Sequence, residues 1–410
     1  MAPAIWRVGT ITVPSSTGTA SVTGLGGTPK ALVFYGTNWL TEDASVTSSG
    51  TGVFRGMCAP QWDAPGTLLQ NAATVTPAGD QHSEQNSAIL MHTTAGTGSN
   101  LYGATVSSLD ADGFTVSWWQ AAAGGYKVVY VALMEVTDCG AHIGGTSTLG
   151  LGWKAGASLL HGAWAGPVIG GTNRTQEFFG GAAYPGSSGG SSWPGAGLSA
   201  YTFPTSNSAQ YNIGIFNQAA GTVICQGGSF VGPFLTTQNV TAIPSGGGLT
   251  NFTLSFNDAS NEGMVVVWDD EDSTTGRLTP ATSQGGTVTV SGLPFEPGLV
   301  IGYSISDEPQ GQSTGGRGAI GFSVVTPKFQ WTALVDGHSS QGAFQSFQRG
   351  VADVVNSTNV HAGTIELTDD GFIVTTEEDD VSPASWVWHA FGHPNRGGWL
   401  PQIYRRVVPA

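Results

Sequence analysis

The chain has 410 residues, of which 40% are hydrophobic, only 10% are charged and 13 are tryptophan. This apolar and aromatic composition excludes the disordered class and predicts compact domains. The net charge of −15 excludes the nucleic-acid backbone as a general partner and disfavours anionic membranes, so we expect neither nucleic-acid binding nor membrane insertion.

The first predicted elements are β-strands. Residues 19–23 alternate polar and apolar side chains, which is typical of a half-buried strand. A short turn with Pro29 follows, and the continuous apolar run 31–35 then predicts a central strand. Residues 110–113 (Asp-Ala-Asp-Gly) lie between two strand patterns, and a glycine able to adopt a positive φ there predicts a tight hairpin. Another apolar strand is predicted over residues 127–134.

The same order of elements returns near the end of the chain. Residues 18–35 align without a gap with residues 286–303, at an offset of 268. Residues 109–116 match residues 367–374, at an offset of 258. Two matched blocks in one order, with a shorter loop in the second copy, indicate a duplicated domain.

The middle of the chain has a weaker version of this pattern. Residues 252–256 and 264–268 resemble the hairpin partner and the closing strand, and residues 165–170 are the best candidate for the front half. We therefore predict an all-β protein of tandem antiparallel β-sandwich domains, jelly-roll-like, derived from an internal repeat. The predicted domains are residues 1–140, 141–275 and 276–393, followed by a C-terminal docking extension over 394–410.

Few residues suggest chemistry. The acidic run 269–272 offers the oxygen ligands that Ca²⁺ prefers, which makes Asp269, Asp270 and Asp272 weak calcium candidates. A solvated loop at a strand end explains the run more simply. The Gly-x-Ser-x-Gly pattern at 186–190 has glycine and serine on both flanks instead of a strand and a helix, so it predicts a loop. We assign no catalytic residue, no metal and no cofactor.

Tryptophan side chains are the candidate ligand contacts, because a flat apolar ring with a polar rim suits a sugar. The candidates for carbohydrate or receptor contact are Trp39, Trp118, Trp119 and Trp193, with core packing as the alternative for each. Trp118 and Trp119 are neighbours in a predicted strand and point to opposite faces, so one of them is expected to be exposed or at an interface.

The end of the chain is basic. Arg396, Trp399, Arg405 and Arg406 form a candidate subunit-docking segment on an otherwise acidic protein. A frayed, solvated terminus is the alternative interpretation.

Three blocks, residues 6–10, 22–37 and 112–116, together resemble the repeated β-domains of minor tail proteins of long-tailed bacteriophages that infect actinobacteria. The most specific part, residues 23–37, reads TGLGGTPKALVFYGT. The resemblance implies a structural virion protein of a tail tip or baseplate that contributes to host attachment. It implies other tail proteins and a host-envelope glycan or protein as partners, and a homo-oligomer, with a trimer expected by analogy with tail fibres. No catalytic residue comes with it.

Without a visible secretory signal at the start of the sequence, we expect assembly in a bacterial cytoplasm and localisation in the virion tail. Three alternatives stay open: a carbohydrate-binding, lectin-like module; a capsid-decorating head fibre; and a glycan-degrading tail enzyme.

Overall fold

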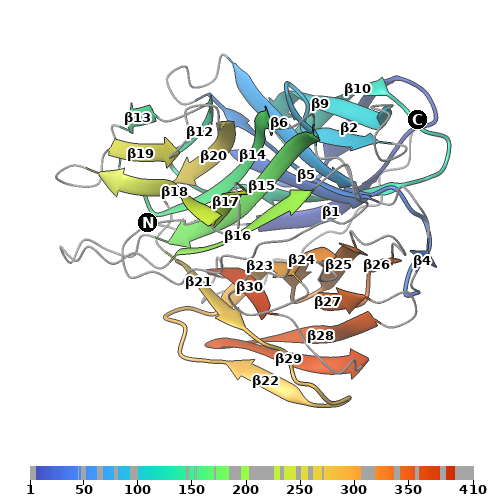
Figure 1. Ribbon diagram of the computed structural model, residues 1–410. Coiled ribbons are helices and arrows are strands. Elements are labelled where there is room, and N and C mark those ends of the chain that lie inside the picture. The colour runs from blue at the N-terminus through green and yellow to red at the C-terminus, as the bar shows by residue number, and fades with distance from the viewer. Residues whose placement is uncertain are drawn as a thin grey trace.

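The computed structural model describes residues 6–44, 46–47, 52–61, 68–77, 82–92, 100–144, 147–151, 153, 155–169, 172–183, 195–202, 226–230, 235–245, 251–256, 262–269, 272–305, 319–336, 342–355, 360–378 and 385–392. Within these ranges every regular element is a β-strand, and all named strands pair antiparallel (Figure 1). The predicted all-β class is confirmed. The same ranges contain no helix long and apolar enough to cross a membrane.

The first part of the chain forms two sheets. The larger has the order β1 (Trp6–Thr12), β11 (Lys127–Leu133), β3 (Ala31–Thr37), β5 (Gly52–Pro60), β6 (Leu69–Pro77), β7 (His82–Gln85). The smaller has the order β2 (Gly18–Thr23), β10 (Gly113–Gln120), β9 (Asn100–Asp110), β8 (Ile89–His92). A buried cluster that includes Phe34, Phe114 and Trp118 fills the space between them.

The middle part also forms two sheets. The larger has the order β12 (Cys139–Gly144), β20 (Glu262–Trp268), β14 (Ala157–Ile169), β15 (Thr172–Ala183), β16 (Gly195–Thr202). The smaller has the order β13 (Ser147–Gly150), β19 (Asn251–Phe256), β18 (Leu235–Ser245), β17 (Gln226–Phe230).

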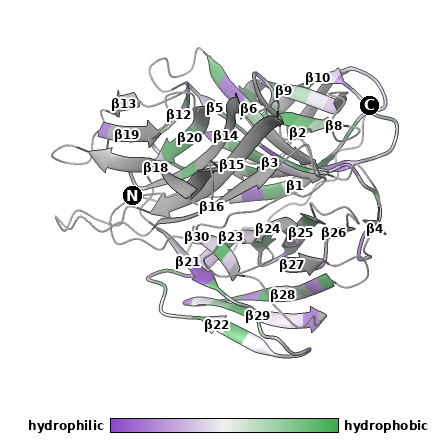
Figure 2. Ribbon diagram, viewed as in Figure 1, coloured by the Kyte–Doolittle hydropathy of each residue, from purple (hydrophilic) through white to green (hydrophobic). Residues whose placement is uncertain are grey.

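The last part repeats this two-sheet arrangement. The larger sheet has the order β21 (Ser273–Leu278), β30 (Ser385–Gly392), β23 (Pro297–Ile305), β24 (Ala319–Thr326), β25 (Phe329–Asp336), β26 (Gly342–Ser346), β4 (Val46–Thr47). The smaller has the order β22 (Thr287–Val290), β29 (Gly371–Glu378), β28 (Val360–Thr368), β27 (Val351–Val355). Figure 2 shows both hydrophilic and hydrophobic residues along β28, which is buried over residues 360–363 and more exposed toward Thr368.

The three sheet pairs share a strand order. Each larger sheet starts with its first strand, its closing strand and then the third: β1-β11-β3, β12-β20-β14 and β21-β30-β23. Each smaller sheet starts with β2-β10, β13-β19 or β22-β29. The remaining strands follow mostly as hairpin neighbours. Because the first and closing strands are paired in every case, the chain enters and leaves each sheet pair at adjacent strands.

One buried apolar cluster joins all three larger sheets. Trp6, Trp268 and Phe391 come from β1, β20 and β30, and their ring centroids lie 4.7 to 5.8 Å apart. The cluster around them also contains buried side chains of β3, β5, β14, β23, β24 and β25. The three larger sheets therefore pack around a common core, in addition to following one another along the chain.

Strand β4 belongs in sequence to the first part but in space to the last. It pairs antiparallel with β26, through Thr47↔Gly342 and Val46↔Ala343. The segment that leads to it is held by contacts with the last part, including Asp43 N to Gln345 O at 2.8 Å and Ser346 Oγ to Asp43 Oδ1 at 2.5 Å.

The matched sequence blocks build the same turn twice. The Asp112 carboxylate accepts hydrogen bonds from Gly24 N at 2.8 Å and Gly26 N at 2.7 Å. In the last part the Asp370 carboxylate accepts one from Gly292 N at 3.3 Å. A Cβ on Gly113 or on its match, Gly371, would overlap the carbonyl oxygen of the facing β2 or β22 residue. The predicted tight hairpins are confirmed, and close backbone approach explains both glycines.

Candidate functional site

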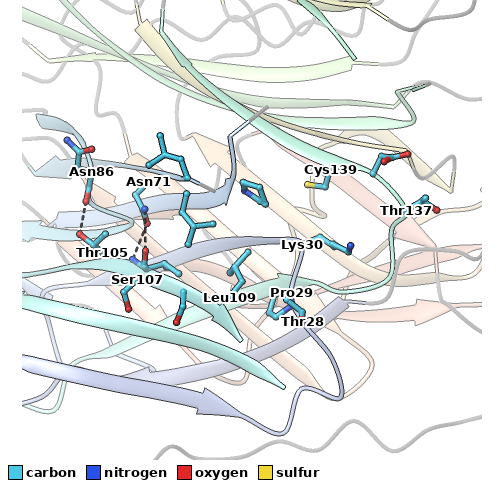
Figure 3. Close-up of a pocket in the computed structure, with 16 residues that line it drawn as sticks. Thr28, Pro29, Lys30, Asn71, Asn86, Thr105, Ser107, Leu109, Thr137 and Cys139 are labelled. Carbon is cyan, nitrogen blue, oxygen red and sulfur yellow. Dashed lines mark hydrogen bonds between the residues drawn. The ribbon is translucent and has the colours of Figure 1, made fainter. Parts of the chain in front are cut away.

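A groove of about 800 Å³ opens at the edge of the first sheet pair, between β6 and β9. Its other side is formed by residues 28–30 and by residues 137–139, which lead into the middle part. Figure 3 shows Asn71, Thr105 and Ser107 on one side of the groove, and Lys30 and Cys139 on the other. Its volume is in the range of sites that hold small ligands.

An amide clamp lies on the wall of this groove. Val106 N donates to Asn71 Oδ1 at 3.0 Å, and Asn71 Nδ2 donates to Val106 O at 3.4 Å. Strand β8 pairs with β9 only as far as Ala104, so Val106 has no strand partner on that side. The Asn71 side chain substitutes for one residue of a missing strand and blocks the open edge. Asn71 and Val106 are both buried.

The same clamp occurs in the last part with a longer side chain. Ile365 N donates to Gln330 Oε1, and Gln330 Nε2 donates to Ile365 O, both at 3.0 Å. Gly350, on the segment that leads into β27, packs against this glutamine. The clamp is therefore a structural device of the sheet edge in both parts.

Hydroxyl groups form one wall of the groove, and their hydrogens are already used. Thr105 Oγ1 donates to Asn86 O at 2.7 Å, Ser107 Oγ donates to Thr115 O at 3.2 Å, and Ser108 Oγ donates to Asp110 Oδ1 at 2.7 Å. A hydroxyl group that has given its single hydrogen keeps lone pairs that accept. This wall therefore suits a ligand that supplies donors.

The opposite side carries one basic and one acidic residue, Lys30 and Asp138, beside Cys139. Burial raises the pKa of the Cys139 thiol, so it stays protonated near neutral pH and is a poor nucleophile. Asp138 is the only carboxylate on the groove wall, in the part of the chain that the structure describes.

The structure separates the four candidate tryptophans. Trp118 is 2% exposed and packs edge-on against Tyr102, with centroids 6.4 Å apart. Trp39 is 6% exposed, and its carbonyl accepts a bond from Gln345 Nε2 at 2.9 Å. Neither indole presents a face to a ligand, so both assignments as ligand contacts are corrected: these rings complete hydrophobic cores. Trp119 is 39% exposed, as expected for one of two neighbours on opposite sheet faces. Trp193 lies outside the described residues.

The calcium candidates are also reassigned. Asp269 is buried, and its Oδ1 accepts a bond from Thr137 N at 3.1 Å, so it holds the connection between the first and middle parts. Burial, with the charge of Asp138 as a lesser cause, raises its pKa. The expected solvated loop is wrong at this residue. Asp272 contributes its carbonyl to Gly392 N at 2.7 Å, and Asp270 is outside the described residues. In the described ranges no cluster of three or more His, Cys, Asp or Glu side chains is suited to a metal.

The docking candidates Arg396, Trp399, Arg405 and Arg406 also lie outside the described residues. The groove itself was not predicted. Its hydroxyl groups were visible as Ser and Thr in a strand pattern, but their position beside Asn71 depends on how the two sheets pack. Models of known protein families and a search of curated proteins gave no match to this chain.

Proposed function

We propose that this chain is a structural, non-enzymatic protein of a bacteriophage tail tip or baseplate that contributes to attachment at the host surface. The observation that supports the proposal most is the apolar core shared by all three larger sheets. Such a core holds the three sheet pairs together, which is suited to a structural role. The blocks that resemble tail-protein β-domains supply turns of the first sheet pair, through Gly24, Asp112 and Gly113.

The partners in this proposal are neighbouring tail proteins and further copies of this chain, with a glycan or protein of the host envelope at the exposed surface. A single polypeptide already brings three sheet pairs around one core. We therefore place contacts between copies on the outer surfaces and not on the faces that form this core.

Electron microscopy of intact particles labelled with an antibody to this chain tests the location. We expect label at the tail tip, and none on particles whose gene for this chain is deleted. Label on the head would favour the head-fibre alternative, and particles without label would overturn the assignment to the virion.

Two observations favour a second function, that of a carbohydrate-binding module. The groove has a hydroxyl wall, and Trp119 is exposed with its ring over Gly103 of β9, the strand that carries Thr105 and Ser107 of that wall. The glycan-degrading alternative gains nothing from the groove, since glycoside hydrolysis generally needs two facing carboxylates and the groove wall has only Asp138 in the described ranges.

A further inference from the structure

The outer face of the first small sheet is rich in hydroxyl groups, and two of them, on Ser108 and Thr115, donate to the carboxylate of Asp110 at its edge. Side chains alternate across a strand, and Val22, Phe114 and Val116 point into the core. The opposite face of β2, β10 and β9 therefore carries a set of Ser and Thr residues together with one glycine, one tryptophan and, beyond the bulge in β9, one aspartate: Thr19, Ser21, Thr23, Thr115, Ser117, Trp119, Gly103, Thr105, Ser107, Ser108 and Asp110. Thr105 and Ser107 also line the groove, so the face and the groove are continuous.

The indole of Trp119 packs against a specific residue on this face. It lies against Gly103 of β9, where a Cβ would overlap the six-membered ring. Gly103 is two residues from Thr105 on the same strand, a separation of about 7 Å. The exposed ring therefore lies directly beside the hydroxyl wall of the groove.

The matched face of the last part is different. At the offset of 258, the position of Trp119 is occupied by Glu377, which forms an ion pair with Arg349 at 3.0 Å. Glu366 adds a second acidic side chain to that small sheet. The sheet fold alone thus does not require an exposed tryptophan at this position.

On the face of the first small sheet, the hydrogen bonds show which hydroxyl groups donate and which accept. Thr115 Oγ1 donates to Asp110 Oδ2 at 2.7 Å, so the 2.9 Å bond between Ser21 and Thr115 is donated by Ser21. Together with Thr105 and Ser107, these hydroxyl groups have used their hydrogens and offer only lone pairs. A ligand for this face must bring many donors and an apolar surface for the indole.

We propose that this face and the adjoining groove bind a neutral oligosaccharide, with Trp119 stacking on a sugar ring and the hydroxyl wall accepting bonds from sugar hydroxyl groups. This proposal names a ligand class for the attachment role in the proposed function. It rests on that function only for the assignment of the ligand to a host surface. The Asp110 carboxylate beside Thr115 and the net charge of −15 would repel an acidic glycan, so a neutral ligand suits this face better.

An extended peptide added to the edge of β9 is the competing occupant, and the edge does not favour it. Both main-chain groups of Val106 are already bonded to Asn71, and β9 ends at Asp110, where the hairpin begins. Too little strand is left for the run of main-chain bonds that gives strand addition its affinity.

Isothermal titration calorimetry of the purified full chain tests the site. The ligands are the tetrasaccharides of glucose, mannose, galactose and N-acetylglucosamine, with tetragalacturonate as the acidic control and tetra-alanine as the peptide control. We expect at least one neutral tetrasaccharide to bind. Trp119→Ala should weaken that binding about tenfold or more, and Trp119→Phe should retain part of it, because stacking needs an aromatic ring.

Matched variants separate the site from the fold. Gly103→Ala should weaken binding by displacing the indole, while Glu377→Ala, at the matched position of the last part, should leave it unchanged. Circular dichroism establishes that each variant is folded. The proposal is overturned if no neutral tetrasaccharide binds at millimolar concentration, if Trp119→Ala binds as well as the parent, or if only tetra-alanine binds. None of these results affects antibody labelling of particles, which tests the tail location separately.

Discussion

Tyr35 and Tyr303 face each other between the first and last larger sheets, with their hydroxyl oxygens 3.5 Å apart. They are also matched positions of the two similar sequence blocks, 268 residues apart. Both rings are buried, Tyr35 against Phe322 and Trp331 and Tyr303 against Phe322. Burial is the main reason that the pKa of Tyr35 is raised well above its usual range. The first and last parts thus contact each other through the same position of their sheets.

Removing one of these rings should destabilise the protein strongly. We expect Tyr35→Ala to lower the free energy of unfolding by about 3 to 5 kcal/mol, since it leaves a cavity in the shared core. Tyr35→Phe should cost about 1 kcal/mol or less, because it removes only one long hydrogen bond. Urea denaturation followed by far-UV circular dichroism measures both values, and equal losses would contradict this account of the interface.

The shared core also predicts cooperative unfolding. Tryptophan fluorescence and far-UV circular dichroism should report one coincident transition, because separating the sheet pairs exposes the cluster around Trp6, Trp268 and Phe391. Two or three resolved transitions would show that the sheet pairs are stable independently, contrary to this expectation.

The amide clamps make a paired prediction. Asn71→Ala leaves the buried N–H and C=O of Val106 without partners and should cost about 2 to 3 kcal/mol of stability. Gln330→Ala should have a similar effect on Ile365. Asn71→Asp retains an acceptor but buries a carboxylate against the Val106 carbonyl, so a loss at least as large as that of Asn71→Ala is expected. The measurement is the urea midpoint, and an Asn71→Ala variant as stable as the parent would show that these two hydrogen bonds contribute little to stability.

The neighbouring tryptophans should differ in stability effect. Trp118→Ala removes a ring buried in the first sandwich and should cost about 3 to 5 kcal/mol. Trp119→Ala removes a partly exposed ring and should cost about 1 kcal/mol or less. Thermal unfolding of the two variants side by side checks this, and a reversed order would place Trp119 in the core.

His389 predicts a dependence of stability on pH. Its ring is buried against Phe391, at a centroid distance of 4.1 Å, and burial lowers its pKa from 6.5 to about 3. Between those values the unfolded chain binds a proton that the folded chain does not. The free energy of unfolding should therefore fall as pH drops below 6.5, by up to about 1.4 kcal/mol per pH unit from this residue.

In the other two larger sheets, the register position that corresponds to His389 is occupied by a valine. These residues are Val131, which pairs with Val8, and Val266, which pairs with Ala141. His389→Val should therefore flatten the pH dependence between about pH 7.5 and pH 5.5. Urea midpoints of the parent and the variant at both values give the comparison. An unchanged slope would assign the pH dependence to other groups.

Periodicity and turn residues predicted much of the fold. The alternation over residues 19–23 and the apolar run over 31–35 correspond to β2 and β3, and Asp112 and Gly113 form the predicted hairpin. The same features predicted β19 and β20 of the middle part. These signals are local, so the sequence alone is sufficient to show them.

What sequence could not predict depends on contacts between distant segments. A hydrophobicity pattern gives no sign that Asn71 bonds Val106, or that Trp39 packs beside Gln345 of the last part. Trp118 and Trp119 could be placed on opposite faces, but which face is covered depends on the partner sheet. The sequence also did not reveal that β14 corresponds to β3. Leu159 pairs with the closing strand at Val266 as Val33 does at Val131, and Leu159 lies six residues before Ala165, where the matching segment was predicted to start.

The pairing of β4 with β26 has a consequence for biosynthesis. The partner of Thr47 is Gly342, about 295 residues further along the chain. At synthesis rates of up to about 20 residues per second, the ribosome needs roughly 15 s or more to supply that partner. Until then the β4 segment has no strand partner on the nascent chain, and the outer edge of the last sheet is completed only after Gly342 and Ala343 have been translated.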